Sequence, residues 1–449
     1  MAPHLGGICM NTTRTVRVLR VLRYRYASPK LWWRQGLFWG GAMLVAAIAI
    51  GFASGADYAG RLFRLMTDGR PWLPFLLAPA GLAISVQLTR SVFPGAQGSG
   101  IPQTIAALHL TDSATIDRIL SLRVAVGKVV LTLLGLACGA SIGREGPTVQ
   151  IGAALMNALG RAARVPSVDV QRALVLAGGA AGVSAAFNTP LAGVVFAIEE
   201  LSHSFESRTS GTVFTAVILA GATTLALLGN YTYFGQTSSD LPLGVAWIAV
   251  PACSLAGGLL GGFFSWSLIH AARGFRGKAG QFVQRHPVAF AALCGLALAV
   301  FGFVSGGQSY GTGYGQARAL VAGAVHLPAA YAVLKCAATI VSYISGIPGG
   351  IFAPSLSVGA GIGATLAKFI PAAPAGAMVL LGMVAYFSGV VQAPITATVI
   401  VMEMTDNQTV TIPLMATAML AFAISRMVCT RPLYGALADR FLSAQTRGH

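Results

Sequence analysis

Long apolar segments recur along the whole chain, separated by shorter polar stretches. Each segment approaches the roughly 17–20 residues that a helix needs to cross a bilayer, or continues into apolar neighbours that supply the length. The strands of an outer-membrane barrel would alternate polar and apolar residues, and these segments do not. The pattern therefore predicts an all-α polytopic membrane protein. The segments cover residues 36–54, 72–88, 124–140, 213–228, 245–264, 287–304 and 414–424.

Glycine and proline interrupt this pattern at residues 98–102, 143–147 and 346–354. Each stretch precedes an apolar run, and proline is tolerated in the first turn of a helix, so each predicts a loop leading into a helix start. Irregular backbone at membrane depth survives only where it is buried or lines a cavity. Helix N-termini that converge on one place favour negative charge, so the three stretches predict an anion site in a pore. The alternative is that they are ordinary surface loops.

An internal repeat divides the chain into two halves. Residues 125–153 align with residues 332–360 at a constant offset of 207, which places Gly143 on Gly350. Further along, an offset of 204 places Glu199 on Glu403. Sequence repeats in a membrane protein are typical of transporters, with the site at the repeat interface. We predict a basic N-terminal segment (1–35), a first membrane repeat (36–230), a second membrane repeat (246–430), and a C-terminal helix with a short tail (431–449). Similarity alone leaves open whether the repeats are parallel or inverted.

The charge distribution orients the chain. Only 10% of its 449 residues are charged, yet the net charge is +17. A basic cluster ahead of the first apolar segment predicts a cytoplasmic N-terminus, and residues 12–34 are typical of a basic amphipathic helix on the inner leaflet. Basic residues at the other end place the C-terminus in the cytoplasm too. Nucleic-acid binding is disfavoured, because no basic soluble domain studded with aromatic residues exists. The two clusters comprise Arg14, Arg17, Arg20, Arg23, Arg25, Lys30 and Arg34, and Arg426, Arg431, Arg440 and Arg447.

Metal, cofactor and enzyme chemistry find little support. The six cysteines are scattered without CxxC spacing and are typical of small buried hydrophobic residues. Glu200 and His203 have the ExxH spacing of di-metal bundle sites, but the second half offers no matching pair. A membrane-embedded enzyme would need a nucleophile–base pair at helix depth, and His109, His203 and His270 have no convincing partner. We expect no metal, no cofactor and no enzymatic activity.

Four motifs, taken in order, resemble the CLC family of chloride channels and proton-coupled chloride transporters. They are GSGIP at 98–102, GREGP at 143–147, GGIFAP at 349–354 and PLY at 432–434, with support from PLAGVVFAIEE and MEMTDN. The resemblance extends over residues 36–441. It implies about eighteen helical segments, many of them short and tilted, in two inverted halves. It also implies a homodimer in which each subunit has its own pore.

The resemblance implies an anion pathway built from these motifs. The Ser99 hydroxyl and the Tyr434 phenol would bind an anion on its inner part, and the backbone N–H groups of Ile351 and Phe352 would bind a central anion. Ser99 is also a natural helix N-cap, a role compatible with anion binding. Tyr434 is also placed as an interfacial tyrosine near a helix end. The backbone of the pore motifs comprises Gly98, Gly100, Gly143, Arg144, Gly146 and Gly350.

Two glutamates carry the titratable chemistry: by resemblance, Glu145 is the external gate and Glu200 is the inner proton-transfer group. Glu145 falls on Phe352 in the repeat, so only one half adds a titratable side chain to the duplicated helix start. Glu199 has its repeat partner in Glu403, which favours a structural role such as bonding a helix end. Glu200 has no such partner, which favours a specialised role over that of a cytoplasmic-side surface carboxylate. Adjacent helical residues point about 100° apart, so Glu199 and Glu200 have different surroundings.

The expected function is exchange of chloride for protons. A protonated Glu145 loses its charge and admits chloride, so anion and proton compete for one pocket. A passive channel gated by voltage or pH is the alternative, but it would not need the second carboxylate, Glu200. Serine at position 99 resembles the chloride-type members rather than the nitrate or fluoride types. The expected partners are chloride, protons, the lipid bilayer and a second copy of the chain.

Three further features refine this expectation. Gln103 stands where several transporters of this type have an acidic residue, at the cytoplasmic mouth. Lys128 and Lys335 are repeat equivalents that either extend to the interface or add positive potential to the pathway. The chain ends soon after Tyr434, without room for the paired cytoplasmic nucleotide-binding (CBS) domains of many eukaryotic members. A bacterial-type protein of the plasma membrane, with both termini in the cytoplasm, is expected.

Overall fold

The computed structural model describes residues 29–110, 112–165, 167–202, 207–229, 231–275, 277–325 and 327–446. His203, Arg447 and the basic cluster from Arg14 to Arg25 lie outside these residues. The first part of the described chain forms α2 (Pro29–Thr67), α3 (Pro74–Ser91), α4 (Ile101–His109), α5 (Ser113–Ile119), α6 (Leu122–Ala137), α7 (Glu145–Ala162), α8 (Val168–Phe187), α9 (Pro190–Phe196), the π-helix η1 (Ala197–Ser202) and α10 (Ser207–Leu228). The second part forms the 3-10 helix η2 (Val245–Ile248), α11 (Ala249–Arg273), α12 (Gly277–Arg285), α13 (Pro287–Val304), α14 (Tyr314–Val321), α15 (Tyr331–Ile344), α16 (Phe352–Leu366), α17 (Ala375–Val391), α18 (Pro394–Thr405), α19 (Thr411–Val428) and α20 (Leu433–Thr446).

The helices have the lengths expected of a membrane protein with broken spans. Among the described residues, six helices are long and apolar enough to cross a membrane, including the 36-residue stretch Trp32–Thr67. Others, such as α16 and α18, are apolar but shorter than a full span. Each apolar segment predicted from the sequence lies wholly or mostly within a helix. Two further helices, α8 and α17, are not among those segments, although both are buried over nearly their whole length.

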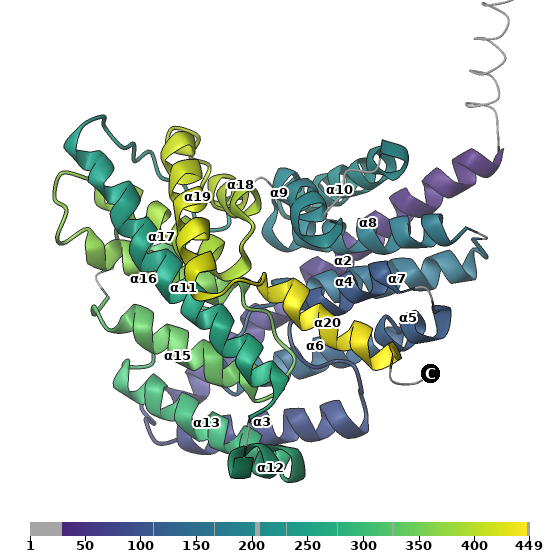
Figure 1. The fold of residues 1–449 in the computed structure, drawn as a ribbon, viewed down its shortest axis with the longest axis horizontal. Coiled ribbons are helices and arrows are strands. Elements are labelled where there is room, and N and C mark those ends of the chain that lie inside the picture. Colours follow the sequence, from purple (N-terminus) through teal and green to yellow (C-terminus); the bar gives the residue numbers. More distant parts are fainter. Residues whose placement is uncertain are drawn as a thin grey trace, which may run out of the picture.

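Helices α7 and α8 lie on one side of the molecule, and α16 and α17 lie on the other (Figure 1). The two pairs pack alike, because repeat-equivalent glycines bring the helix backbones together. A Cβ atom added at Gly152 would overlap the backbone of Gly178, and one added at Gly359 would overlap the backbone of Gly382. Small residues at a helix crossing allow this close approach. The repeat seen in the sequence is therefore also a repeat of packing.

Reciprocal contacts relate the halves by an approximate two-fold axis. The Gly143 N–H donates to the Gly350 carbonyl at 2.7 Å, and the Gly350 N–H donates to the Gly143 carbonyl at 2.8 Å. Glu199 accepts hydrogen bonds of 2.6 and 3.2 Å from two N–H groups in the first turn of α18. Glu403 accepts bonds of 2.6 and 3.1 Å from the equivalent N–H groups of α9. Contacts that are returned in this way are the mark of a two-fold relation. The structural role predicted for Glu199 is confirmed.

The C-terminal helix α20 crosses the molecule and packs against α4 (Figure 1). Its first turn belongs to the largest apolar core, where Leu433 and Tyr434 are fully buried. The starts of α4 and α20 are thereby brought to the place where the two halves meet.

Candidate functional site

Three loops converge where the halves meet, and backbone hydrogen bonds join them. The Gly98 N–H donates to the carbonyl of Ile347 at 3.2 Å, and the Gly349 N–H donates to the carbonyl of Gly98 at 3.1 Å. The reciprocal pair of Gly143 and Gly350 completes the junction. The helices that follow, α4, α7 and α16, therefore begin close together. The first N–H groups of a helix have no intrahelical partner, so their positive ends meet here.

Glycine is required at this junction. The motif residues Gly98 and Gly100 have φ values of 67° and 103°, a backbone region that other residues rarely adopt. A Cβ atom on Gly146 would overlap the Ser99 hydroxyl and would approach the Cα of Gly350 to 3.3 Å. The predicted surface-loop alternative is wrong, because the segment from Ser99 to Pro102 and both other loop centres are buried.

Two buried hydroxyl groups, one from each of two helix starts, face this junction. Ser99 and Tyr434 are both buried, and Ser99 lies within reach of the Tyr434 phenol. Neither oxygen makes a hydrogen bond of good geometry to any described residue. The helix-capping alternative for Ser99 is wrong, because the cap position of α4 is Gly100 and no side chain caps it. The interfacial alternative for Tyr434 is also wrong, because its side chain is fully buried. Buried hydroxyl groups of this kind can donate hydrogen bonds to an anion.

The start of α16 lies in an apolar shell. Ile351 is its N-cap and Phe352 its first residue, and both are buried. The Phe352 ring lies 6.0 Å from the ring of Tyr434, measured between centroids. An anion at these N–H groups would be shielded from water, where helix-end dipoles act more strongly. The shell around Phe352 also includes Phe187, Phe196 and Phe387.

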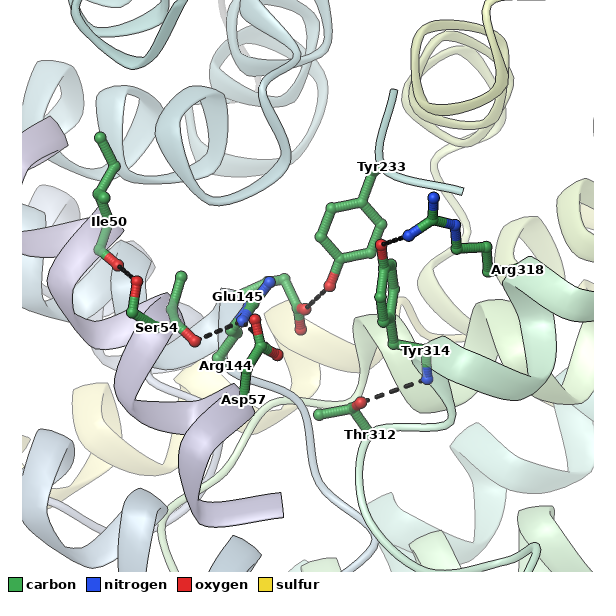
Figure 2. Close-up of polar contacts among 10 residues, drawn as sticks. Ile50, Ser54, Asp57, Arg144, Glu145, Tyr233, Thr312, Tyr314 and Arg318 are labelled. Atoms are coloured by element: carbon green, nitrogen blue, oxygen red, sulfur yellow. Dashed lines mark hydrogen bonds and ion pairs between the residues drawn. The ribbon is translucent and has the colours of Figure 1, made fainter. Parts of the chain in front are cut away.

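The Glu145 side chain occupies this region from the α7 side. It is 0% exposed, and its Oε1 accepts a hydrogen bond from the Tyr233 hydroxyl at 3.3 Å (Figure 2). The carboxylate also interacts with its own N–H and with the N–H of Ala353, in the first turn of α16. Its Oε2 has no partner of good geometry within the described chain. The carboxylate therefore lies against the helix start where an anion would be expected.

Arg144 is fixed by the first long helix. Its guanidinium forms a 2.9 Å ion pair with Asp57 and donates to the carbonyl of Ala53 at 2.6 Å, both on α2 (Figure 2). The same group lies 5.7 Å from the centre of the Tyr233 ring. Sequence reasoning missed Asp57 and Tyr233. Asp57 has a weak sequence signal, since it is an acidic residue in an apolar helix, but Tyr233 belongs to no motif.

Glu200 lies at a second place, on the π-helix η1 that continues α9. It is 2% exposed, so the surface alternative predicted for it is wrong. Its Oε1 makes no hydrogen bond to any residue that the structure describes. The Tyr434 phenol interacts electrostatically with both Glu200 and Glu145, so both carboxylates lie near it. Short π-helical segments of this kind occur frequently at functional sites.

The two repeat-equivalent lysines hold loops and do not reach the interface. Both are fully buried, so the snorkelling alternative is wrong. The Lys128 ammonium donates to the carbonyl of Gly98 at 2.9 Å, and the Lys335 ammonium donates to the carbonyl of Gly311 at 2.6 Å. This symmetry reveals a motif pair that sequence reasoning missed: GSG at 98–100 matches GTG at 311–313, at an offset of 213. In the second copy the Thr312 hydroxyl accepts a hydrogen bond from the Tyr314 N–H at 3.2 Å, whereas Ser99 has no such bond.

A cavity of about 450 Å³ reaches Ser99 from one face of the molecule. Its lining includes Gln103, Tyr343 and Arg440, the last on α20. Glu200 is absent from that lining among the described residues. The cavity therefore reaches Ser99 and not Glu200.

Comparison with known proteins gives one consistent result. Residues 81–426 match the family described as "Voltage gated chloride channel". The "H(+)/Cl(-) exchange transporter ClcA" of Salmonella paratyphi B is 30% identical over 384 residues, which cover 83% of this chain and 80% of the relative. A slow cyanobacterial Cl-/H+ antiporter superposes with a TM-score of 0.75 at 24% identity, covering 92% of this chain and 99% of the other. A CLC-type fluoride/proton antiporter superposes with a TM-score of 0.75 at 22% identity, covering 90% and 98%. The fold class predicted from the sequence is confirmed.

Proposed function

The chain belongs to the voltage gated chloride channel (CLC) family, and on that premise we propose that it exchanges chloride for protons across the membrane. It is a multi-pass membrane protein for anion transport and not an enzyme. The finer proposal is that Glu145 is the gate and that Glu200 transfers protons on the inner side. The position of the Glu145 carboxylate against the first turn of α16 is the observation that carries it.

The gate works by competition. An ionised carboxylate is an anion attached to the chain. At the start of α16 it occupies the N–H groups, at the positive end of the helix dipole, that would otherwise bind chloride. A protonated Glu145 has no charge to hold it there, so the side chain leaves and chloride enters. Binding of chloride and binding of a proton are thus linked through one pocket, as an exchanger requires.

The anion would travel by the hydroxyl groups. We assign Ser99, Tyr434 and the N–H groups of Ile351 and Phe352 to chloride, because they are donors that bind an anion without a permanent charge. Such a site binds strongly enough for entry and weakly enough for release. The proton would travel by Glu200, which does not line the cavity that reaches Ser99.

The names of the relatives support coupling to protons, since ClcA is named an exchange transporter for protons and chloride. One structural neighbour is named a fluoride/proton antiporter, so the transport assay compares chloride with fluoride directly. The proposal includes a homodimer with a pore in each subunit, cytoplasmic termini, and the two membrane repeats at 36–230 and 246–430. Light scattering in detergent tests the dimer, and a protease-cleavable tag at each end of the chain tests the orientation.

Purified protein in liposomes tests the exchange. A chloride gradient without a proton gradient should drive protons uphill, and the pH shift should persist when the voltage is clamped. Replacing chloride by fluoride in the same assay identifies the anion. A chloride flux without a pH shift would indicate a passive channel instead.

Two variants test the assigned residues. Glu145→Gln should conduct chloride without moving protons and without dependence on pH, and Glu200→Gln should stop proton movement while chloride still passes. Asp240→Asn, which changes an exposed carboxylate, is the matched control and should behave as the wild type. Proton pumping preserved in Glu145→Gln would contradict the gate assignment.

A further inference from the structure

The partner of the Glu145 carboxylate comes from outside both repeats. Tyr233 lies in the connection between α10 and η2, which has no equivalent in the internal repeat. Its hydroxyl donates to Glu145 Oε1 at 3.3 Å, and both side chains are buried (Figure 2). The residue is thus an addition to the duplicated pore element, like the carboxylate that it contacts.

The fold holds the Tyr233 ring in place. The neighbouring Phe234 N–H donates to the carbonyl of Met404 at 3.0 Å, and the Asn188 amide donates to the carbonyl of Tyr231 at 2.9 Å. These bonds attach the connection to α18 on one side and to the end of α8 on the other. The ring also packs against three others, with centroid distances of 4.7 Å to Tyr314, 5.0 Å to Phe234 and 5.5 Å to Phe187. The phenol is therefore a fixed point, and the carboxylate is the partner that can move.

The charged and titratable groups facing Glu145 are few. They are Arg144 on the same loop, Tyr233 on the connection, and Tyr434 on α20, with Asp57 of α2 behind Arg144. The bonds of the Arg144 guanidinium go to Asp57 and Ala53 of α2, and it forms no ion pair with the Glu145 carboxylate among the described residues. The Tyr233 phenol makes the side-chain hydrogen bond that the carboxylate has in the position it now occupies.

We propose that Tyr233 is a latch for the gate: its hydroxyl holds the ionised Glu145 side chain against the start of α16 and thereby sets how readily the pathway opens. A hydrogen bond to an ionised carboxylate is stronger than one to a neutral carboxyl group. Protonation therefore weakens the latch at the same moment that it removes the charge of the gate. The inference rests on the gate role proposed above, and Tyr233 is a positioning residue in it.

The variant Tyr233→Phe keeps the ring and removes the latch. Losing one hydrogen bond to a charged group should favour release by about tenfold. Because the carboxylate then competes less well, chloride binding measured by calorimetry at neutral pH should tighten about tenfold. The external pH of half-maximal chloride flux should move upward by about one unit, because the carboxylate is then released at a lower proton concentration. The ratio of protons to chloride should stay the same.

Two controls make the test specific. Tyr314→Phe removes a neighbouring phenol that is bonded to Arg318, and should leave both measurements as in the wild type. In a Glu145→Gln background, Tyr233→Phe should change chloride binding no further. Wild-type binding and an unshifted pH profile in Tyr233→Phe would overturn the latch, as would an equal effect in the Glu145→Gln background. If the wild type moves chloride without protons, the exchange proposal fails, while tighter chloride binding in Tyr233→Phe would still support the latch.

Discussion

Replacing Glu403 with alanine removes both acceptors of the free N–H groups in the first turn of α9. The two bonds are 2.6 and 3.1 Å long, and the side chain is half-buried. Loss of a helix cap costs about 1 kcal/mol for each bond, so Glu403→Ala should lower the free energy of unfolding by about 2 kcal/mol. Glu403→Gln keeps one acceptor oxygen and should lose about half of that.

The two-fold relation makes this prediction stringent. Glu199 binds the start of α18 with bonds of 2.6 and 3.2 Å, so Glu199→Ala should cost the same as Glu403→Ala. Thermal unfolding in detergent measures the effect, with a decrease in melting temperature of about 2 °C for each alanine variant. Asp240→Ala, at an exposed acidic residue, is the control and should be neutral. Alanine variants that melt like the wild type, or a large difference between the two sites, would refute the reasoning.

Two further predictions concern the pore junction. Ser99→Ala and Tyr434→Phe each delete a buried hydroxyl that has no good partner in the described chain, so the melting temperature should hold or rise while chloride affinity by calorimetry falls about tenfold. A large loss of stability in either variant would instead show that the hydroxyl is structural. Gly146→Ala should reduce the yield of folded protein severely, because the new methyl group meets Ser99 and the backbone of Gly350, whereas Gly435→Ala, in open space, should be tolerated.

Much of the architecture could be predicted because it depends on local properties. Apolar length alone predicts where α2, α11 and α13 lie, since a bilayer span requires a minimum number of apolar residues. The offset between equivalent residues predicted that Glu199 and Glu403 share a structural role. The second GSG-like motif, at 311–313, is hard to detect in the sequence, because only its two glycines are identical and the offset differs by six from that of the first motif pair.

The candidate site, too, was predicted in part from the sequence and in part only from the structure. Motifs singled out Ser99, Glu145, Glu200 and Tyr434, and their residue types already indicate donors for an anion and carriers for a proton. The alternatives open for Ser99 and Tyr434 needed the structure, because a serine before a helix or a tyrosine near a helix end has the same sequence signature whether or not it is buried. The burial of both side chains, and the start of α4 without a side-chain cap, decided between them.

The sequence by itself determined that this is a duplicated, multi-span anion-transport protein, because hydrophobicity, repeats and motifs are properties of the linear sequence. Only the tertiary structure decided what surrounds the gate. The hydrogen bond between Tyr233 and Glu145 joins residues 88 positions apart, and the bond between Arg144 and Ala53 spans 91. Such contacts depend on where separate helix ends meet, and no local pattern encodes that meeting point.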